Sequence, residues 1–203
     1  MSLECSPTFD HDQLGFVAEV TSAFRFLSTD YGFRCIRIDP SFVRYESSLT
    51  FINIYHGRRS SELGVEIGKL ENISGLQENW YTIGEVLDLI GVRKKLGFTF
   101  FQASTRERVQ MLVPKLAEYV KEHAKPILEG NLQIFERLHD LRHKKSEEYI
   151  KDMRLSQIRE EAEKVWHKKD YAKLVELYNS MKDDLTPVEV KKLEYAQKHL
   201  HSS

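Results

Sequence analysis

Apolar and polar positions alternate most regularly between residues 42 and 68. Segments 42–46, 49–56 and 61–68 are short, rich in Val, Ile, Phe and Tyr, and separated by polar turns. Such segments are typical of strands joined by hairpins. The pattern therefore predicts an antiparallel meander at the centre of the chain.

The lengths of the two turns set the register of this meander, because antiparallel partners have a constant sum of residue numbers. A two-residue loop at Ser47–Ser48 places Val43 opposite Ile52, and a turn over Gly57–Ser60 places Ile52 opposite Val65. Both assumptions gather the same apolar side chains on one face: Val43, Tyr45, Ile52, Ile54, Leu63, Val65 and Ile67. A slip of one residue would send a strand's apolar set to the other face, so the agreement supports the meander.

The opposite face of the meander mixes aromatic and charged side chains, namely Arg44, Glu46, Phe51, Asn53, Tyr55, Glu62 and Glu66. One interpretation is a half-solvated face, or a face that a helix partly covers. The other is a partner-binding surface anchored by Phe51 and Tyr55, with Arg44, Glu62 and Glu66 around them.

Helical spacing of apolar residues precedes the meander. Leu14 to Leu27 predicts a helix that Asp10 or Asp12 caps and that ends near Gly32. A first strand follows over Phe33–Ile38, and residues 69–81 are irregular, with Trp80 and Tyr81 expected to fix this loop to the core.

Most of the chain after the meander also has helical spacing. A short helix is expected over Thr82–Gly91. Ser104 and Glu107 have the spacing of a capping box, Pro114 is expected to kink or restart the helix that follows, and Pro126 is expected to open another.

The last unit, residues 155–200, has the pattern of a helical hairpin. Trp166 ends one apolar helix face, and Tyr171 and Tyr178 belong to the next, after a short HKKD joint. Thr186-Pro-Val-Glu189 is a capping box that opens the final helix. We expect the hairpin either to pack on the body of the protein or to offer Trp166, Tyr171 and Tyr178 to a partner.

Composition narrows the classes of function. The chain has 203 residues and a net charge of −1, which disfavours a generally basic nucleic-acid binder. Its two cysteines, Cys5 and Cys35, form no metal-binding or CxxC pattern and are expected to be free thiols of a reducing compartment. No apolar run approaches the length of a membrane span, so the sequence predicts a cytoplasmic protein with no membrane partner.

Two clusters could carry chemistry. Glu136, His139, His143 and Glu147 follow one helix face and could share a metal ion, although the chain lacks a second Glu-x-x-His, and a charged, solvated face is the alternative. Arg93-Lys94-Lys95 lies beside phenylalanines and could contact single-stranded nucleic acid, although a solvated loop is the alternative. No P-loop, GxGxxG or GxSxG motif accompanies them, so we expect no catalytic residues and no cofactor.

Several segments together resemble a family of uncharacterised bacterial proteins of about this length: FRFLSTDYGF, VRYESSLTFINIYHGRRSSELGVEIG, ILEGNLQIFERL and WHKKDYAKLVELYNSMKDDLTPVEVKKLEYAQKH. Within the last segment, WHKKDYAKLVELY is similar to one helical hairpin of a tetratricopeptide-like repeat, present as a single copy. The resemblance carries no catalytic motif. It implies an immunity or defence-accessory role, because small α+β proteins of this kind often have one.

The sequence therefore predicts an α+β fold, with a sheet domain over residues 1–101 and a helical region over residues 102–203. The leading functional hypothesis is a non-enzymatic module that binds a protein partner, of the toxin-neutralising or defence-accessory type. A metal-dependent enzyme built on Glu136, His139 and His143 is one alternative. A weak binder of single-stranded nucleic acid is the other.

Overall fold

The structure, a computed structural model, describes residues 14–70 and 79–201 of the chain. They belong to two compact units, Met1–Arg142 and His143–Ser203. Each unit has its own cluster of buried apolar side chains. The expected caps Asp10 and Asp12, and the expected free thiol of Cys5, lie outside the described residues.

The first unit combines a sheet with helices. Its elements, in chain order, are α1 (Phe16–Ala23), α2 (Phe26–Tyr31), β1 (Arg34–Asp39), β2 (Phe42–Glu46), β3 (Thr50–His56), β4 (Glu62–Lys69), β5 (Trp80–Thr82), α3 (Ile83–Leu89), β6 (Phe101–Gln102), α4 (Arg106–His123), α5 (Lys125–Leu128) and the start of α6 (Gln133–His167). The second unit contains the rest of α6, then α7 (Tyr171–Asn179), η1 (Lys182–Asp184) and α8 (Pro187–His201).

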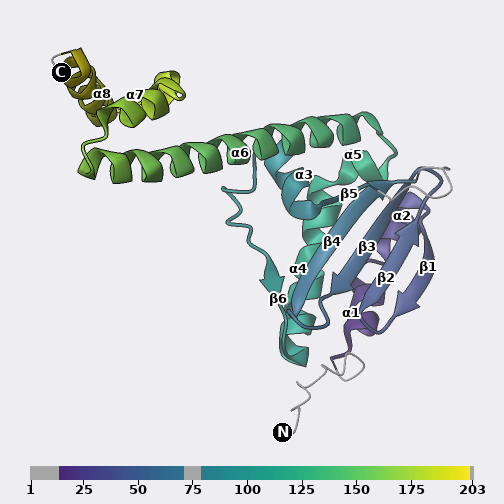
Figure 1. Ribbon diagram of the computed structural model, residues 1–203. Coiled ribbons are helices and arrows are strands. Elements are labelled where there is room, and N and C mark those ends of the chain that lie inside the picture. Colours follow the sequence, from purple (N-terminus) through teal and green to yellow (C-terminus); the bar gives the residue numbers. More distant parts are fainter. Residues whose placement is uncertain (1–13, 71–78, 202–203) are drawn as a thin grey trace, which may run out of the picture. The chain divides into compact units, whose positions relative to one another are not determined.

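The predicted α+β fold with an antiparallel meander is confirmed. The strands follow the order β1-β2-β3-β4-β5, and β6 pairs with β4 beside β5. Helices α1, α2 and α4 cover one face of this sheet, as Figure 1 shows. The apolar side chains predicted for that face are buried in the core of the first unit, and Val43, Ile52, Ile54 and Ile67 have no exposed surface.

The predicted register was wrong by two residues in both hairpins. Val43 pairs with Ile54, and Ile52 pairs with Ile67. In the first hairpin the turn is longer than expected, because the Ser47 hydroxyl accepts from the backbone N–H of Thr50 at 3.0 Å and holds a wider loop. A shift of two residues keeps each side chain on its face, since side chains alternate with a period of two. The prediction of which side chains share a face is therefore correct, although the predicted pairing is wrong.

Several predicted helix ends are also corrected. The single helix expected over Leu14–Leu27 is divided into α1 and α2, although Gly32 closes it in the left-handed conformation as expected (φ 71°). Helix α4 is capped by Thr105, which accepts from the N–H of Arg108 at 3.3 Å, rather than by Ser104. Pro114 lies inside α4 without ending it, and the predicted start at Pro126 is confirmed by α5.

Two short strands were missed in segments without alternation. Trp80 and Tyr81 belong to β5, which pairs with the Gly68 end of β4. Strand β6 pairs with the other end of β4, where the buried His56 ring donates from Nε2 to the carbonyl of Ala103 at 2.6 Å. Strands of two or three residues are too short to show a pattern, so only their pairing with β4 defines them.

Contacts place α4 with the sheet, because its apolar stripe packs against α1 and β4. The sequence pattern alone predicts this helix as part of the helical region over residues 102–203.

The second unit has a core of its own, made by Ala162 of α6 together with residues of α7, the following turn and α8: Leu174, Leu177, Tyr178, Met181, Leu193 and Ala196. Within the described ranges, no helix combines the length and the apolar character needed to cross a membrane.

Separate cores predict separate unfolding. Ile54 has no exposed surface, so Ile54→Ala should lower the free energy of unfolding of the first unit by about 2–5 kcal/mol. Trp80 reports on the first unit and Trp166 on the second, and these are the two tryptophans of the chain. Urea unfolding followed by fluorescence, in Trp166→Phe and Trp80→Phe backgrounds, should show the shift at Trp80 alone. The matched variant Leu174→Ala should shift the Trp166 transition instead; equal shifts at both reporters would contradict separate cores.

Candidate functional site

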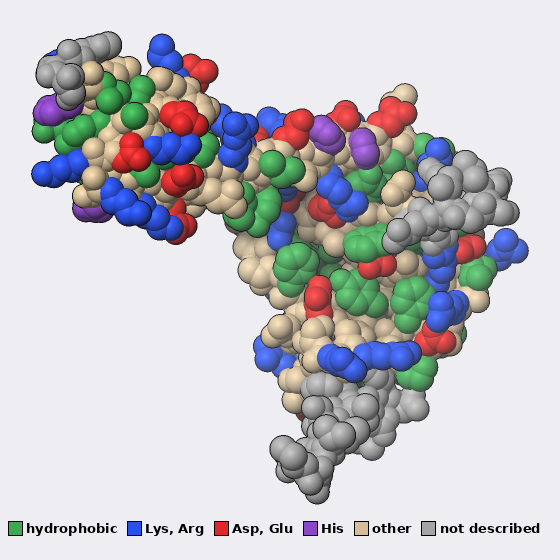
Figure 2. Space-filling model, viewed as in Figure 1, with side chains coloured by type: hydrophobic (Ala, Val, Ile, Leu, Met, Phe, Trp, Pro, Cys, Tyr) green, Lys and Arg blue, Asp and Glu red, His purple; other side chains and the backbone are tan. Residues whose placement is uncertain are grey.

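One face of the sheet is covered by no helix of residues 14–70 and 79–201, and its own side chains shield it. Phe51 and Tyr55 of β3 lie across Gly68 and Gly64 of β4, where a Cβ atom would come within 2.2 Å of the Phe51 ring and 2.4 Å of the Tyr55 ring. Arg44 covers Phe51 from the other side, with its guanidinium carbon 4.1 Å from the ring centroid. Figure 2 shows hydrophobic and charged side chains interleaved on this face.

This packing decides what the predicted sheet surface can offer. The structure does bring Arg44, Phe51, Tyr55, Glu62 and Glu66 onto one face. Phe51, however, has no exposed surface, so its ring serves the sheet and is not an exposed anchor. The accessible part of the face is therefore made by half-buried side chains, in which the aromatic rings of Phe42 and Tyr55 lie among charged groups.

Two carboxylates of β4 lie on this open face of the sheet. Glu62 accepts from the Tyr55 hydroxyl at 3.0 Å, and Glu66 accepts from Nδ2 of Asn53 at 3.1 Å. Burial raises the pKa of Glu66; the Asn53 hydrogen bond opposes this rise and the charge of Glu62 adds to it. The Oδ1 atom of Asn53 is buried without a hydrogen-bond partner in the described part of the chain. The site can accept hydrogen bonds, but these carboxylates already have partners.

A third carboxylate has the opposite electrostatic environment. Glu85 completes the capping box of α3 with Thr82, and Arg142 of α6 donates to both its oxygens at 2.7 and 2.8 Å. Burial opposes ionisation, yet the hydrogen bonds from Arg142 and Thr82 prevail and lower the pKa of Glu85. The same guanidinium donates to the Trp80 carbonyl at 2.8 Å and lies 4.2 Å from the Tyr81 ring centroid. Arg142 thus fixes the start of α6 to the first unit.

The second unit has a cluster of partly exposed aromatic rings. Trp166 at the end of α6 meets Tyr171 of α7 and Tyr195 of α8, with ring centroids 6.0 and 5.6 Å away, and Tyr195 stacks on His199 at 4.0 Å. Tyr195 is 46% exposed. The predicted residue Tyr178 is buried in the core of this unit and takes no part in the cluster.

A pocket of about 550 Å³ lies beside these rings. Its walls are Trp166, His167, Lys169, Tyr171, Val188, Lys191, Lys192 and Tyr195. The joint between α6 and α7 forms one side: Lys169 takes the left-handed conformation (φ 58°), and Asp170 caps α7 by accepting from the N–H of Lys173 at 3.1 Å. Helix α8 forms the other side. Of the predicted residues, Trp166 and Tyr171 are brought together here.

The α8 side of the pocket was missed from the sequence, although a signal was present. Val188, Lys191, Lys192 and Tyr195 lie three, four and seven residues apart, which places them on one helix face. Lysines interrupt this face, so its apolar residues alone do not mark it as a binding surface. A basic residue beside a tyrosine at helical spacing is the pattern that could have revealed it.

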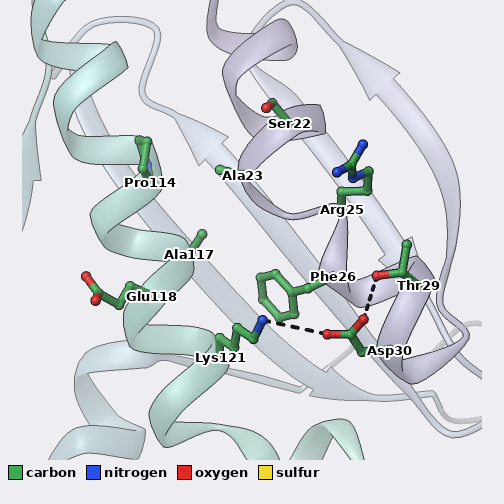
Figure 3. A pocket seen from close by; sticks show the side chains of 10 residues that line it. All are labelled: Ser22, Ala23, Arg25, Phe26, Thr29, Asp30, Pro114, Ala117, Glu118 and Lys121. Atoms are coloured by element: carbon green, nitrogen blue, oxygen red, sulfur yellow. Dashed lines mark hydrogen bonds and ion pairs between the residues drawn. The ribbon is translucent and has the colours of Figure 1, made fainter.

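A groove in the first unit was also not predicted. A cavity of about 370 Å³ lies between α1, α2 and α4, and Figure 3 shows its lining. Lys121 reaches across it to Asp30 at 3.7 Å and lies 5.4 Å from the centroid of the Phe26 ring. Its central charges are therefore paired with each other. Pro114 on its wall was predicted only as a helix irregularity.

The structure gives little support to the two other predicted sites, the metal site on α6 and the basic cluster at residues 93–95. Glu136 and His139 are exposed on α6, and His143 lies 3.5 Å from Glu147, its neighbour on the helix. In residues 14–70 and 79–201, no three or more His, Cys, Asp or Glu side chains are grouped so as to hold a metal ion. In the basic cluster, Arg93 pairs with Asp88 at 2.9 Å, while Lys94 and Lys95 are exposed.

Comparisons with protein-family models, curated proteins and solved structures gave no match to this chain. The resemblance to a bacterial defence-accessory family therefore stays a prediction. The geometry singles out the pocket of the second unit as the candidate site, because it joins partly exposed rings to basic side chains.

The contacts over glycine predict a strong coupling between Tyr55 and Gly64. Gly64→Ala should lower the free energy of unfolding by about 1–3 kcal/mol, because the new methyl group would overlap the Tyr55 ring, which its hydrogen bond to Glu62 holds in place. In a Tyr55→Ala background the same substitution should cost far less. A double-mutant cycle by urea unfolding measures the difference. Equal costs in both backgrounds would show that the ring does not rest on Gly64.

Glu85 and Glu66 predict opposite contributions to the pH dependence of stability. The pKa of Glu85 is lowered by folding, so its contribution is complete above the unfolded pKa of about 4.5 and is lost as the pH falls through the folded value. The pKa of Glu66 is raised, so its contribution is complete below about 4.5 and is lost as the pH rises through the folded value. Compared with wild type, Glu85→Gln should lose less stability on acidification, and Glu66→Gln should be relatively more stable at neutral pH. Urea unfolding at acidic pH values around 4.5 and at neutral pH tests both variants. If both substitutions changed the pH dependence of the unfolding free energy with the same sign, the assignment would be contradicted.

Proposed function

We propose that this chain is a non-enzymatic module that binds a protein partner, and that the pocket of the second unit is its contact site. The observation that carries the proposal is the cluster of Trp166, Tyr171 and Tyr195, of which Tyr195 is exposed and the other two are half-buried, at the wall of a pocket of about 550 Å³. Tryptophan and tyrosine are the residues that contribute most often to binding energy at protein interfaces. A pocket of this volume accommodates one or two side chains of a partner.

The rigidity of the pocket walls supports this proposal. Arg159 of α6 donates to Glu189 of α8 at 2.9 Å and to the Asp184 carbonyl at 2.8 Å. The capping box of α8 fixes its start, because Thr186 N–H donates to Glu189 at 2.7 Å. A preformed pocket loses little conformational entropy when a partner binds, which favours affinity.

The open sheet face is a second possible contact surface of the same module. The polar edges that it offers, from Arg44, Tyr55, Glu62 and Glu66, belong to half-buried side chains, and Phe51 has no exposed surface. Polar edges of this kind support the rim of an interface better than its centre. We therefore place the main contact on the second unit. The toxin-neutralising or defence-accessory type of partner is a proposal from the resemblance.

Selection from a displayed library of random peptides, with the full-length chain immobilised, tests the proposed module. We expect enriched peptides whose affinity falls at least about tenfold with Val188→Glu, because this change puts a charge into the apolar wall of the pocket. Val188 is 64% exposed, so folding should be unaffected. The matched control is Val190→Glu on the same helix, outside the pocket lining, which should bind as the wild type does.

Two outcomes would count against the proposal. A selection that enriches no peptide above an empty matrix would contradict a peptide-binding module. Peptides that bind equally to the wild type and Val188→Glu would contradict this pocket as the contact site.

A further inference from the structure

We infer that the pocket of the second unit recognises an acidic peptide segment that carries an apolar side chain among its carboxylates. The inference rests on the proposed function and adds the chemical class of the partner. It follows from the charges around the pocket, from the way in which its rings are already used, and from the backbone conformation of one of its lysines.

The charges of the pocket are of one sign. Its lining includes three lysines, Lys169, Lys191 and Lys192, together with His167, and no Asp or Glu. Glu163 on α6 accepts from Lys192 at 2.6 Å and lies 3.2 Å from His167. Lys169 and Lys191 make no ion pair with any residue that the structure describes. Two positive charges of the pocket lining therefore have no ion-pair partner among the described residues, and a partner that complements them is acidic.

The apolar part of the pocket calls for a side chain and not for an anion alone. Trp166, Tyr171, Tyr195 and Val188 form a continuous wall in which Val188 and Tyr195 are 64% and 46% exposed. A free phosphate or carboxylate would leave this surface in contact with water. An apolar side chain of a peptide would remove it from water, while its acidic neighbours reach the lysines at the rim.

The ring geometry favours a peptide over a single-stranded nucleic acid. Bases bind to proteins of that class by stacking on exposed ring faces. Here Tyr195 is stacked on His199 at 4.0 Å, and Lys192 lies over the Trp166 ring at 5.3 Å. The rings of Trp166, Tyr171 and Tyr195 meet one another edge to face. These contacts already occupy one face each of Tyr195 and Trp166, so less ring surface is left for stacking of bases.

The backbone at Lys169 supports a binding role for its side chain. Lys169 has a φ of 58°, in the left-handed region where glycine is the ordinary residue at the end of a helix. Its N–H donates to the Trp166 carbonyl at 3.0 Å, so the conformation closes α6. A lysine is strained at this position, and residues held in such conformations tend to occur at functional sites. A positive charge at the pocket rim is the feature that glycine would not provide.

Fluorescence anisotropy with the full-length chain tests the inference. The probe is a short fluorescein-labelled peptide in which glutamates flank one phenylalanine. Control probes replace the glutamates by lysines, or the phenylalanine by alanine, and a labelled oligothymidine represents single-stranded nucleic acid. We expect saturable binding of the acidic probe that weakens as salt increases, binding at least about tenfold weaker without the phenylalanine, and none of the lysine probe.

Charge reversal separates this pocket from the rest of the surface. Lys169→Glu with Lys191→Glu should weaken binding of the acidic probe at least about tenfold. The matched control is Lys94→Glu with Lys95→Glu, two exposed lysines of the first unit, which changes the net charge equally and should leave binding unchanged. Lys169→Gly should raise the midpoint of thermal unfolding and yet weaken binding, a combination that a merely structural lysine would not produce.

Four outcomes would overturn the inference: no binding of the acidic probe, equal binding of the lysine probe, equal weakening by both double variants, or preferential binding of the oligothymidine. Each differs from failure of the proposed function. If library peptides still bind at the Val188 wall while the acidic probe does not, the module stands and only the acidic class of partner is rejected.

Discussion

In the part of the chain that the structure describes, the sheet has helices on one face only, and this constraint governs most of the first unit. Strand β3 lies in the middle of the sheet, so its side chains on the open face need cover that no helix supplies. Glycines at positions 64 and 68 of β4 leave room for the Tyr55 and Phe51 rings to lie flat, and Arg44 closes the surface above Phe51. The aromatic residues of the open face are therefore explained by stability, because a glycine in a strand is stabilised by a ring packed across it.

The same packing explains why the candidate contact site lies on helices and not on the sheet. An aromatic residue can bind a partner only with surface that the fold does not already use. Phe51 has none, whereas Tyr195 is 46% exposed beside a pocket lined with lysines. Phe51 and Tyr195 look equally suitable in the sequence, and the difference between them arises from tertiary packing alone.

The sequence predicted the faces of the meander better than its pairing. Alternation with a period of two determines which side chains share a face, and a shift by two residues, such as Val43 to Ile54 instead of Ile52, leaves the faces intact. The lengths of the turns were harder to predict from the sequence, because the wide first turn depends on a hydrogen bond to the Ser47 hydroxyl. The pocket was predicted in part: Trp166 and Tyr171 follow from the pattern. The spacing in α8 places its pocket residues on one helix face, but the way in which that face meets the α6–α7 joint depends on tertiary packing.

At position 169, glycine would favour stability, whereas lysine supplies a charge for binding. Glycine at this joint would relieve the strain of a positive φ and would close α6 equally well. Lysine adds a charge at the pocket rim, next to a tryptophan and opposite the lysines of α8. Proteins commonly keep such locally unfavourable residues where function requires them. The joint between α6 and α7 therefore has two roles: it turns the chain between the helices, and it directs one positive charge to the entrance of an apolar pocket.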